Sequence, residues 1–283
     1  MALTRMIALF FRRFVRNRSA LAGGTIVLVF IAVALLAPWL SPHDPLAQDL
    51  AQRLKPPSTT HWLGTDDLGR DLLSRLLAGA GFSLQVGLLS VAIALGLGVP
   101  IGLVAGYAGK WLDEALMRLM DMLMAFPGIL LAILIVAVLG PSLTNAMLAI
   151  GLVNVPTYAR LVRAATLGIK GQEYVEAARG AGASDAFILR RHVLPNCMTP
   201  ILVQATLGIA GAILETAGLS FLGLGAQPPQ PEWGTMLNQA RAFIRSAPWT
   251  VAFPGLAIMA VVLGFNLLGD GLRDLLDPRT RKA

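Results

Sequence analysis

The side chains with the clearest chemical potential stand together in one short segment after the first apolar stretch. His61, Asp66, Asp67 and Asp71 all occur there. Imidazoles and carboxylates are metal ligands, but their order matches no ligand spacing of a calcium loop. A helix start explains them better, with Thr65 or Asp66 capping an amphipathic helix that carries several leucines. The sequence therefore predicts no metal site in this segment.

The remaining histidines and the cysteine add no further metal site. His43, His61 and His192 are expected to be too far apart in sequence and topology to share an ion. Cys197 is the sole cysteine, which excludes an internal disulfide framework and a cysteine-based zinc site. The sequence also lacks G-x-x-x-x-G-K-[ST], the loop that holds nucleotide phosphates. We therefore expect no cofactor and no catalytic activity in this chain.

Glu215 is an acidic residue deep inside an apolar run, with Thr216 beside it. A carboxylate at mid-membrane costs about 2.5 kcal/mol or more on insertion scales, so it should face water or a partner. Two interpretations stay open: a substrate pathway or its gate, and a polar pair at a subunit interface. An ion-coupled transporter with Glu215 as its ion site is a third hypothesis, but it requires inverted repeats, and no convincing repeat is present.

The composition indicates which elements carry these residues. Of 283 residues, 55% are hydrophobic and only 14% are charged, and the mean hydropathy is +0.67. Soluble domains have about a quarter charged residues. The net charge of +7 raises the question of nucleic acid, but the charges stand at the edges of apolar runs. That pattern favours orientation in a lipid bilayer, and no nucleic-acid partner is expected.

Uncharged runs long enough to cross a bilayer predict six membrane spans. A spanning helix needs about 20 apolar residues, and Gly140-Pro141-Ser142 divides the longest run because proline interrupts a helix. The predicted spans are 20–40, 83–106, 121–139, 142–161, 199–221 and 246–269. The first is expected to be a retained anchor, since it is long and lacks a good signal-peptide cleavage site.

The distribution of basic residues predicts the orientation. Six spans place both termini on one side of the membrane, and 17 of the 23 Lys and Arg residues fall on that side. Loops rich in Lys and Arg stay in the cytoplasm. Both termini and the segment 164–200 are therefore predicted to be cytoplasmic, and the segment 41–80 external.

The cytoplasmic segment is predicted to form two short helices around a glycine elbow. Residues 171–179 have the composition of a helix, which Gly180-Ala181-Gly182-Ala183 ends. Ser184 can cap a second helix, and Pro195 is expected to end it. Gly182 is expected to need a positive φ or a close approach to a neighbouring surface. The small residues around it leave a flat surface for another protein; the alternative is a solvated loop.

Motifs in this segment resemble those of a known family. Glu176-Ala177-Ala178-Arg179, Gly182 and Leu194-Pro195 resemble the EAA loop of bacterial ABC importer permeases. That pattern has isoleucine two residues before the Leu-Pro pair, where this chain has His192, a departure at one of its less strict positions. Other segments resemble dipeptide and oligopeptide permease subunits. They are Gly64-Thr65-Asp66-Asp67-Leu68-Gly69-Arg70-Asp71, Leu219-Ser220-Phe221-Leu222-Gly223-Leu224-Gly225, Pro231-Glu232-Trp233-Gly234 and Asp277-Pro278-Arg279.

The resemblance implies a fold and a division of the chain. The fold is an all-α integral membrane protein with six transmembrane helices, in the type I ABC importer permease arrangement of a five-helix core plus an N-terminal helix. Residues 1–82 would hold the N-terminal tail, the first span and an external segment. Residues 83–270 would form the transmembrane domain, with the EAA coupling loop at about 171–195, and 271–283 a cytoplasmic tail.

The resemblance also implies partners and a function. The partners are a homologous second permease in a heterodimer, two cytoplasmic ATPase subunits and an external or periplasmic substrate-binding protein, in a bacterial cytoplasmic (inner) membrane. Import of short peptides by alternating access, driven by ATP hydrolysis on the partners, is the implied activity. Nickel or another small solute is the alternative cargo within the family.

Overall fold

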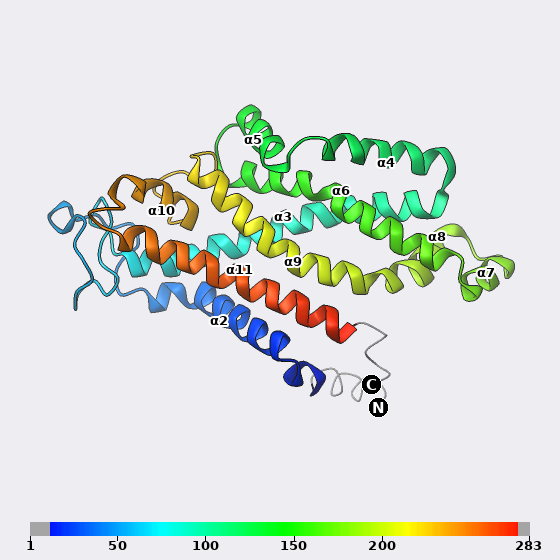
Figure 1. Cartoon of the computed structure of the whole chain (residues 1–283), viewed down its shortest axis with the longest axis horizontal. Helices are drawn as coiled ribbons and strands as arrows, with labels where there is room; N and C mark the ends of the chain where they lie inside the picture. Colours follow the sequence, from blue (N-terminus) through cyan, green and yellow to red (C-terminus); the bar gives the residue numbers. More distant parts are fainter. Residues whose placement is uncertain (1–11, 277–283) are drawn as a thin grey trace.

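The computed structural model describes residues 12–276, which form an elongated helical bundle (Figure 1). Residues 1–11 and the Asp277-Pro278-Arg279 motif of the predicted tail lie outside the described residues. The main helices are α2 (Arg18–Leu40), α3 (Leu72–Ala108), α4 (Lys110–Met124), α5 (Gly128–Leu139), α6 (Leu143–Lys170), α7 (Glu173–Gly180), α8 (Asp185–Ile188), α9 (Leu194–Phe221), α10 (Trp233–Ala240) and α11 (Trp249–Leu276). Short 3-10 turns η1 (Leu50–Gln52) and η3 (Arg241–Phe243) and a π segment η2 (Leu189–Val193) complete the order.

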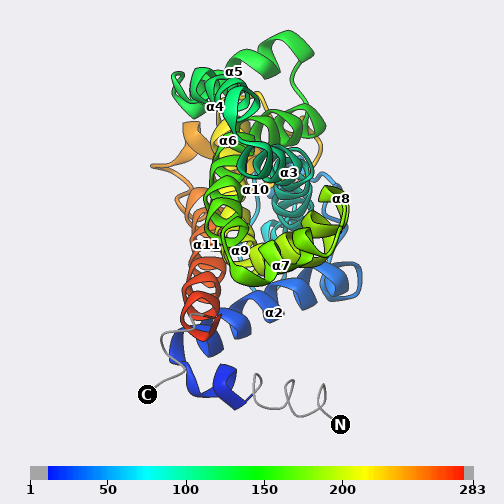
Figure 2. The ribbon, with the colours of Figure 1, turned by 90° about the vertical axis from the view of Figure 1, so that its right-hand side faces the viewer.

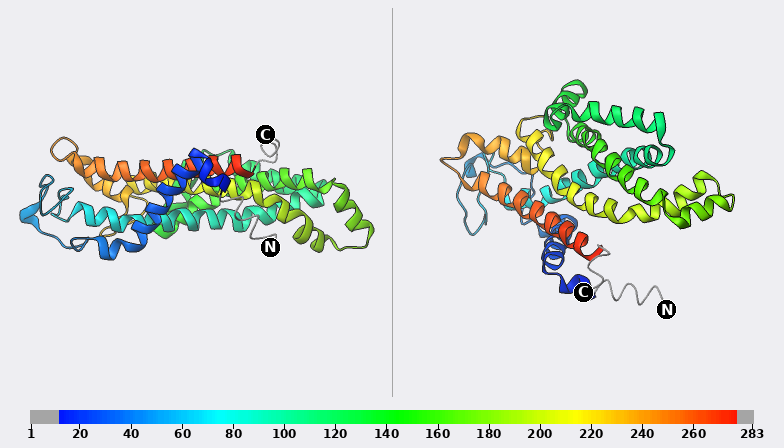
Figure 3. Two further views of the ribbon diagram at one scale, coloured as in Figure 1. Left: turned by 90° about the horizontal axis from the view of Figure 1, so that it is seen from below. Right: turned by 45° about the vertical axis from the view of Figure 1, so that its right-hand side comes forward.

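The long helices run between two ends that carry the shorter elements. The segment between α2 and α3 lies with α10 at one end, and α7 and α8 lie at the other (Figures 1 and 3). Seen along the bundle, α4 and α5 occupy one flank and α2 the opposite flank (Figure 2). The start of α2 and the end of α11 both point toward the end that carries α7 and α8 (Figure 1). These two helix ends and the α7–α8 pair therefore share one end of the bundle, and the side of the membrane on which they lie stays a prediction.

Within residues 12–276, four helical stretches are long and apolar enough to cross a membrane. They are Arg18–Leu40, Leu72–Ala108, Asp185–Phe221 and Trp249–Leu276. The first three contain the predicted spans 20–40, 83–106 and 199–221, and the fourth covers 249–269 of the predicted span 246–269. The bent pair α4 and α5 provides a fifth candidate if it counts as one span.

The predicted span 121–139 is wrong as a continuous helix. The chain breaks between Met124 and Gly128, and α4 and α5 are bent by 86°. Pro127 explains the break, because it lacks an N–H donor and disfavours a helical conformation at the residue before it. α5 has only 12 residues, which reach about 18 Å, against a hydrocarbon thickness of about 30 Å.

The predicted span 142–161 corresponds to α6, which is longer than the predicted span and less apolar than the other long helices. It begins after the predicted turn, where Ser142 accepts a hydrogen bond from the N–H of Asn145. It then continues to Lys170 and carries Arg160 and Arg163 in its second half. These charges explain why α6 falls short of the apolarity of the four stretches above.

The helix expected at the end of the external segment is the first part of α3. Its N-cap is Asp71, whose side chain accepts a hydrogen bond from the N–H of Ser74. The predicted caps Thr65 and Asp66 are therefore wrong. Both belong to a tight loop before the helix, in which Gly64 and Gly69 have positive φ angles of 82° and 74°.

α3 and α6 pack together through a row of glycines. A Cβ atom on Gly98 would lie 2.8 Å from the carbonyl oxygen of Val155, and one on Gly102 would lie 2.4 Å from that of Ala159. Gly106 continues the row, at 2.9 Å from the carbonyl oxygen of Arg163. Small residues at a spacing of four let the backbones of membrane helices approach closely. This contact joins α3 and α6 from the membrane interior to the end that carries α7.

The glycine row gives a stability prediction. Gly102→Leu should force α3 away from α6, with a loss of stability of about 1–3 kcal/mol as in other overpacked interiors. Gly96→Leu is the matched control on the same helix, since a Cβ there meets no described atom within 4 Å. Thermal unfolding of the purified protein in detergent should show a lower melting temperature for the first variant only. Equal melting temperatures for both variants would contradict the proposed packing role.

Candidate functional site

The cytoplasmic segment forms the predicted pair of short helices, α7 and α8. At the elbow between them, Gly182 has a φ angle of 84°, a conformation that glycine adopts without steric cost. Ser184 caps α8, because its Oγ accepts a hydrogen bond from the N–H of Phe187 at 3.4 Å. A Cβ on Gly182 would meet no described atom within 4 Å. Within this chain the glycine is therefore required by its backbone angle and not by crowding.

The α7–α8 loop has an anchored inner face and an open outer face. Val175, Ile188 and Val193 are fully buried and pack with Val162 of α6. The predicted coupling residues divide between exposed Glu176, Ala177, Arg179, Gly182 and Pro195 and half-buried Ala178 and Leu194. The outer side of the loop is therefore available for contact with another protein, while its inner side belongs to the core of this one.

The prediction that Pro195 ends the second helix is wrong. The helix continues through η2 into α9 and gives an unbroken stretch from Asp185 to Phe221. Pro195 follows the π segment in the first turn of α9 and has no N–H to donate to the preceding turn. The preceding π turn, in which the N–H of Leu194 bonds to the carbonyl oxygen of Leu189, carries the chain to that point without a break.

Glu215 has a polar partner within the chain. Its Oε2 accepts a hydrogen bond from the Nδ2 of Asn154 on α6 at 3.2 Å. Thr216 next to it is buried, and its hydroxyl has no hydrogen-bond partner among the described residues. Asn154 also lines a small cavity between α3, α6 and α9, together with Ser90, Tyr158 and Gln204. Polar side chains thus gather in the middle of the bundle, where Glu215 approaches them from α9.

At the opposite end, two of the sequence motifs that are far apart in the chain come together. The indole Nε1 of Trp233, at the start of α10, donates to the carbonyl oxygen of Leu76 at 3.0 Å. Trp249 donates in the same way to the carbonyl oxygen of Thr65 at 3.3 Å. The Nη2 of Arg70 donates to the side chain of Gln239 at 3.2 Å. These bonds fix the segment 64–71 against α10 and the start of α11.

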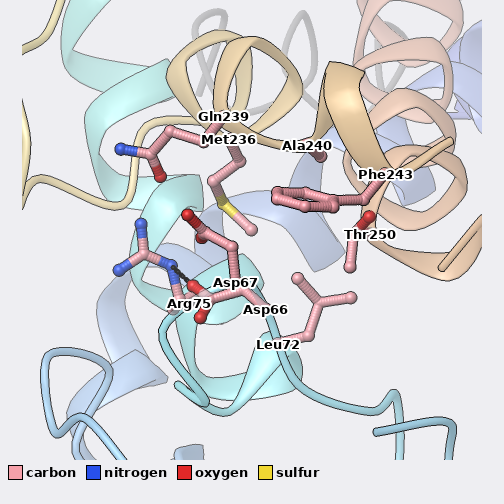
Figure 4. A pocket seen from close by; sticks show the side chains of 9 residues that line it. All are labelled: Asp66, Asp67, Leu72, Arg75, Met236, Gln239, Ala240, Phe243 and Thr250. Atoms are coloured by element: carbon pink, nitrogen blue, oxygen red, sulfur yellow. Dashed lines mark ion pairs between the residues drawn. The ribbon is translucent and has the colours of Figure 1, made fainter. Parts of the chain in front are cut away.

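A buried group of charges lies inside this contact (Figure 4). The Oδ2 of Asp66 is 2.7 Å from the Nε of Arg70 and 3.3 Å from the Nε of Arg75, and both arginine side chains are 1% exposed. Asp67 lies at the edge of the group, where burial raises the pKa of its carboxyl above the usual value and the charge of Asp66 adds to the effect. Asp66 therefore pairs with both arginines, while Asp67 lies 3.6 Å from the Nη2 of Arg70 and is itself disfavoured in the charged form.

The expectation that the histidines are too far apart to share an ion is wrong for the distance between His43 and His61. Their rings lie 4.8 Å apart, and the Nδ1 of His61 is 2.9 Å from the Oδ1 of Asp71. Ligand atoms of these three residues fall within 4.8 Å of one another. The Asp71 carboxylate already accepts two bonds from Ser74, at 2.8 and 2.7 Å, and the Nε2 of His43 bonds to the carbonyl oxygen of Thr60. These hydrogen bonds hold the segment between α2 and α3 in its folded shape, which explains the cluster without a metal ion.

The fold and these sites together define the class of protein. It is an α-helical protein with several helices long and apolar enough to span a membrane, with a helical loop at one end, a charged segment at the other and polar groups in the middle of the bundle. The comparison with family sequences gives the family. Residues 98–282 match the family described as the binding-protein-dependent transport system inner membrane component, and the chain belongs to that family. Residues 6–57 match the N-terminal TM domain of oligopeptide transport permease C.

Curated relatives resemble the chain over almost its whole length. It is 52% identical to the dipeptide transport system permease protein DppC of Alkalihalophilus pseudofirmus, over 96% of this chain and 89% of the relative. It is 50% identical to the di/tripeptide permease DppC of Pseudomonas aeruginosa, over 97% and 92%. Identity to the glutathione permease GsiD of Pectobacterium atrosepticum is 49%, over 96% and 91%. The predicted family is confirmed.

A solved structure supports the predicted fold. The MetNI methionine ABC transporter in an inward-facing conformation contains a chain that superposes with a TM-score of 0.61 at 19% identity, over 73% of this chain and 98% of that one. The type I ABC importer permease fold is therefore confirmed. The second family description covers α2 and the start of the segment after it, up to residue 57, and the first covers residues 98–282.

The external charge group gives a prediction with a matched pair of variants. Asp66→Asn should destabilise the protein by about 3–5 kcal/mol, because it leaves two buried arginines without their carboxylate. Asp67→Asn should instead raise the melting temperature at pH 7, since a carboxyl whose pKa is raised by folding destabilises the fold when charged. That gain should disappear as the pH falls through the raised pKa toward the ordinary value. Thermal unfolding between pH 4 and 8 tests both, and equal losses of stability for the two variants would contradict this assignment.

Proposed function

We propose that this chain is one permease subunit of an ATP-driven importer of short peptides. Its family description supports a role in binding-protein-dependent transport. Relatives at about half identity are described as permeases for dipeptides, di/tripeptides and glutathione, all of which are short peptides. This identity over nearly the whole chain is the observation that carries the proposal.

The partners are those that such transport requires. A homologous second permease completes a heterodimer, two cytoplasmic ATPase subunits supply the energy, and an external substrate-binding protein delivers the peptide. The chain itself lacks a phosphate-binding loop and acts as the membrane component. Residues 1–82 form its tail, anchor and external segment, 83–270 the transmembrane domain, and 271–283 the second tail. Both termini lie in the cytoplasm of a bacterium, as the excess of Lys and Arg on that side indicates.

The outer face of the α7–α8 loop is the docking surface for an ATPase subunit. Its exposed backbone at Glu176, Ala177 and Gly182 is free of bulky side chains, and Phe187 is 51% exposed beside it. An exposed apolar side chain at the edge of small residues suits insertion into a groove on a partner. Closure of the ATPase dimer then moves this loop and changes the packing of the membrane helices between two states.

Glu215 and Thr216 line the peptide pathway in this proposal. Glu215 is only partly buried, and its hydrogen bond to Asn154 leaves the other carboxylate oxygen without a hydrogen-bond partner among the described residues. A carboxylate in that position attracts the ammonium group that every unmodified peptide carries. Alternating access follows from exposing this region first to the outside and then to the cytoplasm.

Uptake by the reconstituted complex tests the function. Proteoliposomes that contain this chain, its partner permease, the ATPases and the binding protein should accumulate a labelled dipeptide only with ATP on the ATPase side. Accumulation should survive collapse of the proton gradient. Uptake driven by a gradient without ATP would contradict the proposal and favour a secondary transporter.

Gly182 provides the test of the docking surface. Asn and Asp have the same size and both tolerate positive φ better than other residues, so Gly182→Asn and Gly182→Asp differ mainly in charge. The aspartate places an uncompensated charge in a protein interface, which should weaken ATPase binding about 100-fold or more. Copurification with the tagged permease should therefore lose the ATPases in the Asp variant and retain them in the Asn variant, with both variants present in the membrane. Full ATPase recovery and uptake in Gly182→Asp would show that the loop is only a solvated connector.

A further inference from the structure

Tyr107 stands at the point where α3 meets the α7–α8 loop. It lies in the last turn of α3, and its side chain is 8% exposed. Its hydroxyl donates a hydrogen bond to the Oδ1 of Asp185, the first residue of α8, at 2.6 Å. The same hydroxyl accepts a bond from the Nη2 of Arg179 on α7 at 3.3 Å. One phenol oxygen therefore binds both short helices.

The ring of Tyr107 adds a second kind of contact. The Cζ of Arg179 lies 5.7 Å from the ring centroid, and the Nζ of Lys170, the last residue of α6, lies 5.4 Å from it. Cations within about 6 Å of an aromatic ring are attracted to its face. Lys170 also donates a hydrogen bond to the carbonyl oxygen of Tyr107. The end of α6 and the end of α7 thus converge on the same side chain.

Beneath these polar contacts Tyr107 belongs to the apolar interior of the loop. It packs in one cluster with Val175, Ile188 and Val193, each of which is fully buried. Within residues 12–276, Tyr107 is the residue of α3 whose side chain hydrogen-bonds to α7 and α8. α6 and α9 are joined to the loop by the chain itself, whereas α3 depends on non-covalent contacts to follow it.

We propose that Tyr107 is the positioning residue that makes α3 move together with the α7–α8 loop. The inference rests on the proposed docking of an ATPase subunit on the outer face of that loop. Motion of the loop reaches α6 and α9 through the backbone. It reaches α3 through the packing of α3 on α6 and, directly from α7 and α8, through the Tyr107 hydroxyl. Asp185 and Arg179 supply the charged partners, which make these hydrogen bonds stronger than neutral ones. Tyr107 therefore sets how much transport each hydrolysed ATP produces.

Tyr107→Phe isolates the hydroxyl. The phenylalanine keeps the ring, its packing and its attraction for the two cations, and it removes both hydrogen bonds. Asp185→Asn keeps the shape of the acceptor and weakens the same contact at an exposed position. Trp111→Phe is the control, because Trp111 is an aromatic residue near the start of α4 and is 75% exposed.

The experiment uses the complete complex in proteoliposomes and measures three quantities: recovery of the ATPase subunits, rate of ATP hydrolysis and peptide imported per ATP hydrolysed. Tyr107→Phe should bind the ATPases as the parent does but import about tenfold less peptide per ATP, as expected for a lost bond to a charged group. Asp185→Asn should change the ratio in the same direction, and Trp111→Phe should leave it unchanged.

The outcomes separate this inference from the proposed function. A parental ratio of peptide to ATP in both Tyr107→Phe and Asp185→Asn would overturn the role of Tyr107 while the proposed function stands. Loss of the ATPases from Tyr107→Phe would also overturn it, since the residue would then shape the docking surface and not transmit its motion. A parent complex that neither binds the ATPases nor imports peptide would contradict the proposed function itself. If Tyr107→Phe fails to fold, the Asp185→Asn ratio decides the question alone.

Discussion

The close contact between α3 and α6 is the constraint on which the remaining structure depends. In lipid, two helices gain nothing from hiding apolar side chains from each other, so their association relies on close packing. Gly98, Gly102 and Gly106 allow that packing because any side chain there would overlap the backbone of α6. The contact ends at Tyr107 of α3 and Lys170 of α6, which hydrogen-bond to each other. Tyr107 also hydrogen-bonds to both helices of the α7–α8 loop. Two membrane helices and the loop are therefore held as one body.

The polar parts of the molecule are arranged around this body according to where water is available. Charges are costly in the hydrocarbon layer, and the buried pair of Arg70 and Arg75 accordingly lies near one end of the bundle, where both pair with Asp66. There the hydrogen bond from Arg70 to Gln239 joins the loop before α3 to α10. Glu215 is an ionisable residue within the bundle itself, where it accepts a hydrogen bond from Asn154.

The sequence was sufficient for features that depend on local chemistry. Apolar length located the long helices. Of the two alternatives predicted for Gly182, a positive φ and a close approach to a neighbouring surface, the structure has the positive φ. Features that depend on context were missed. The break at Pro127 lies inside an uncharged run. The spans were predicted from the length of such runs, so the break was missed. A π turn precedes Pro195 and lets the helix continue, and no residue pattern in the sequence predicted that turn. His43 meets His61 because the external segment folds back on itself, and sequence distance cannot show that. The roles of the coupling residues and Glu215 remain predictions.

The central claim is that α3, α6 and the α7–α8 loop move together when ATP binds to the partner subunits. Spin labels on cysteines placed at Val104 of α3 and Arg190 of η2, both exposed, report the distance between helix and loop in a Cys197→Ala background. Pulsed electron paramagnetic resonance on the full complex should give one distance distribution with the same maximum in the nucleotide-free and ATP-bound states. A maximum that shifts between the two states would show that the loop swings independently of α3 and would contradict the account.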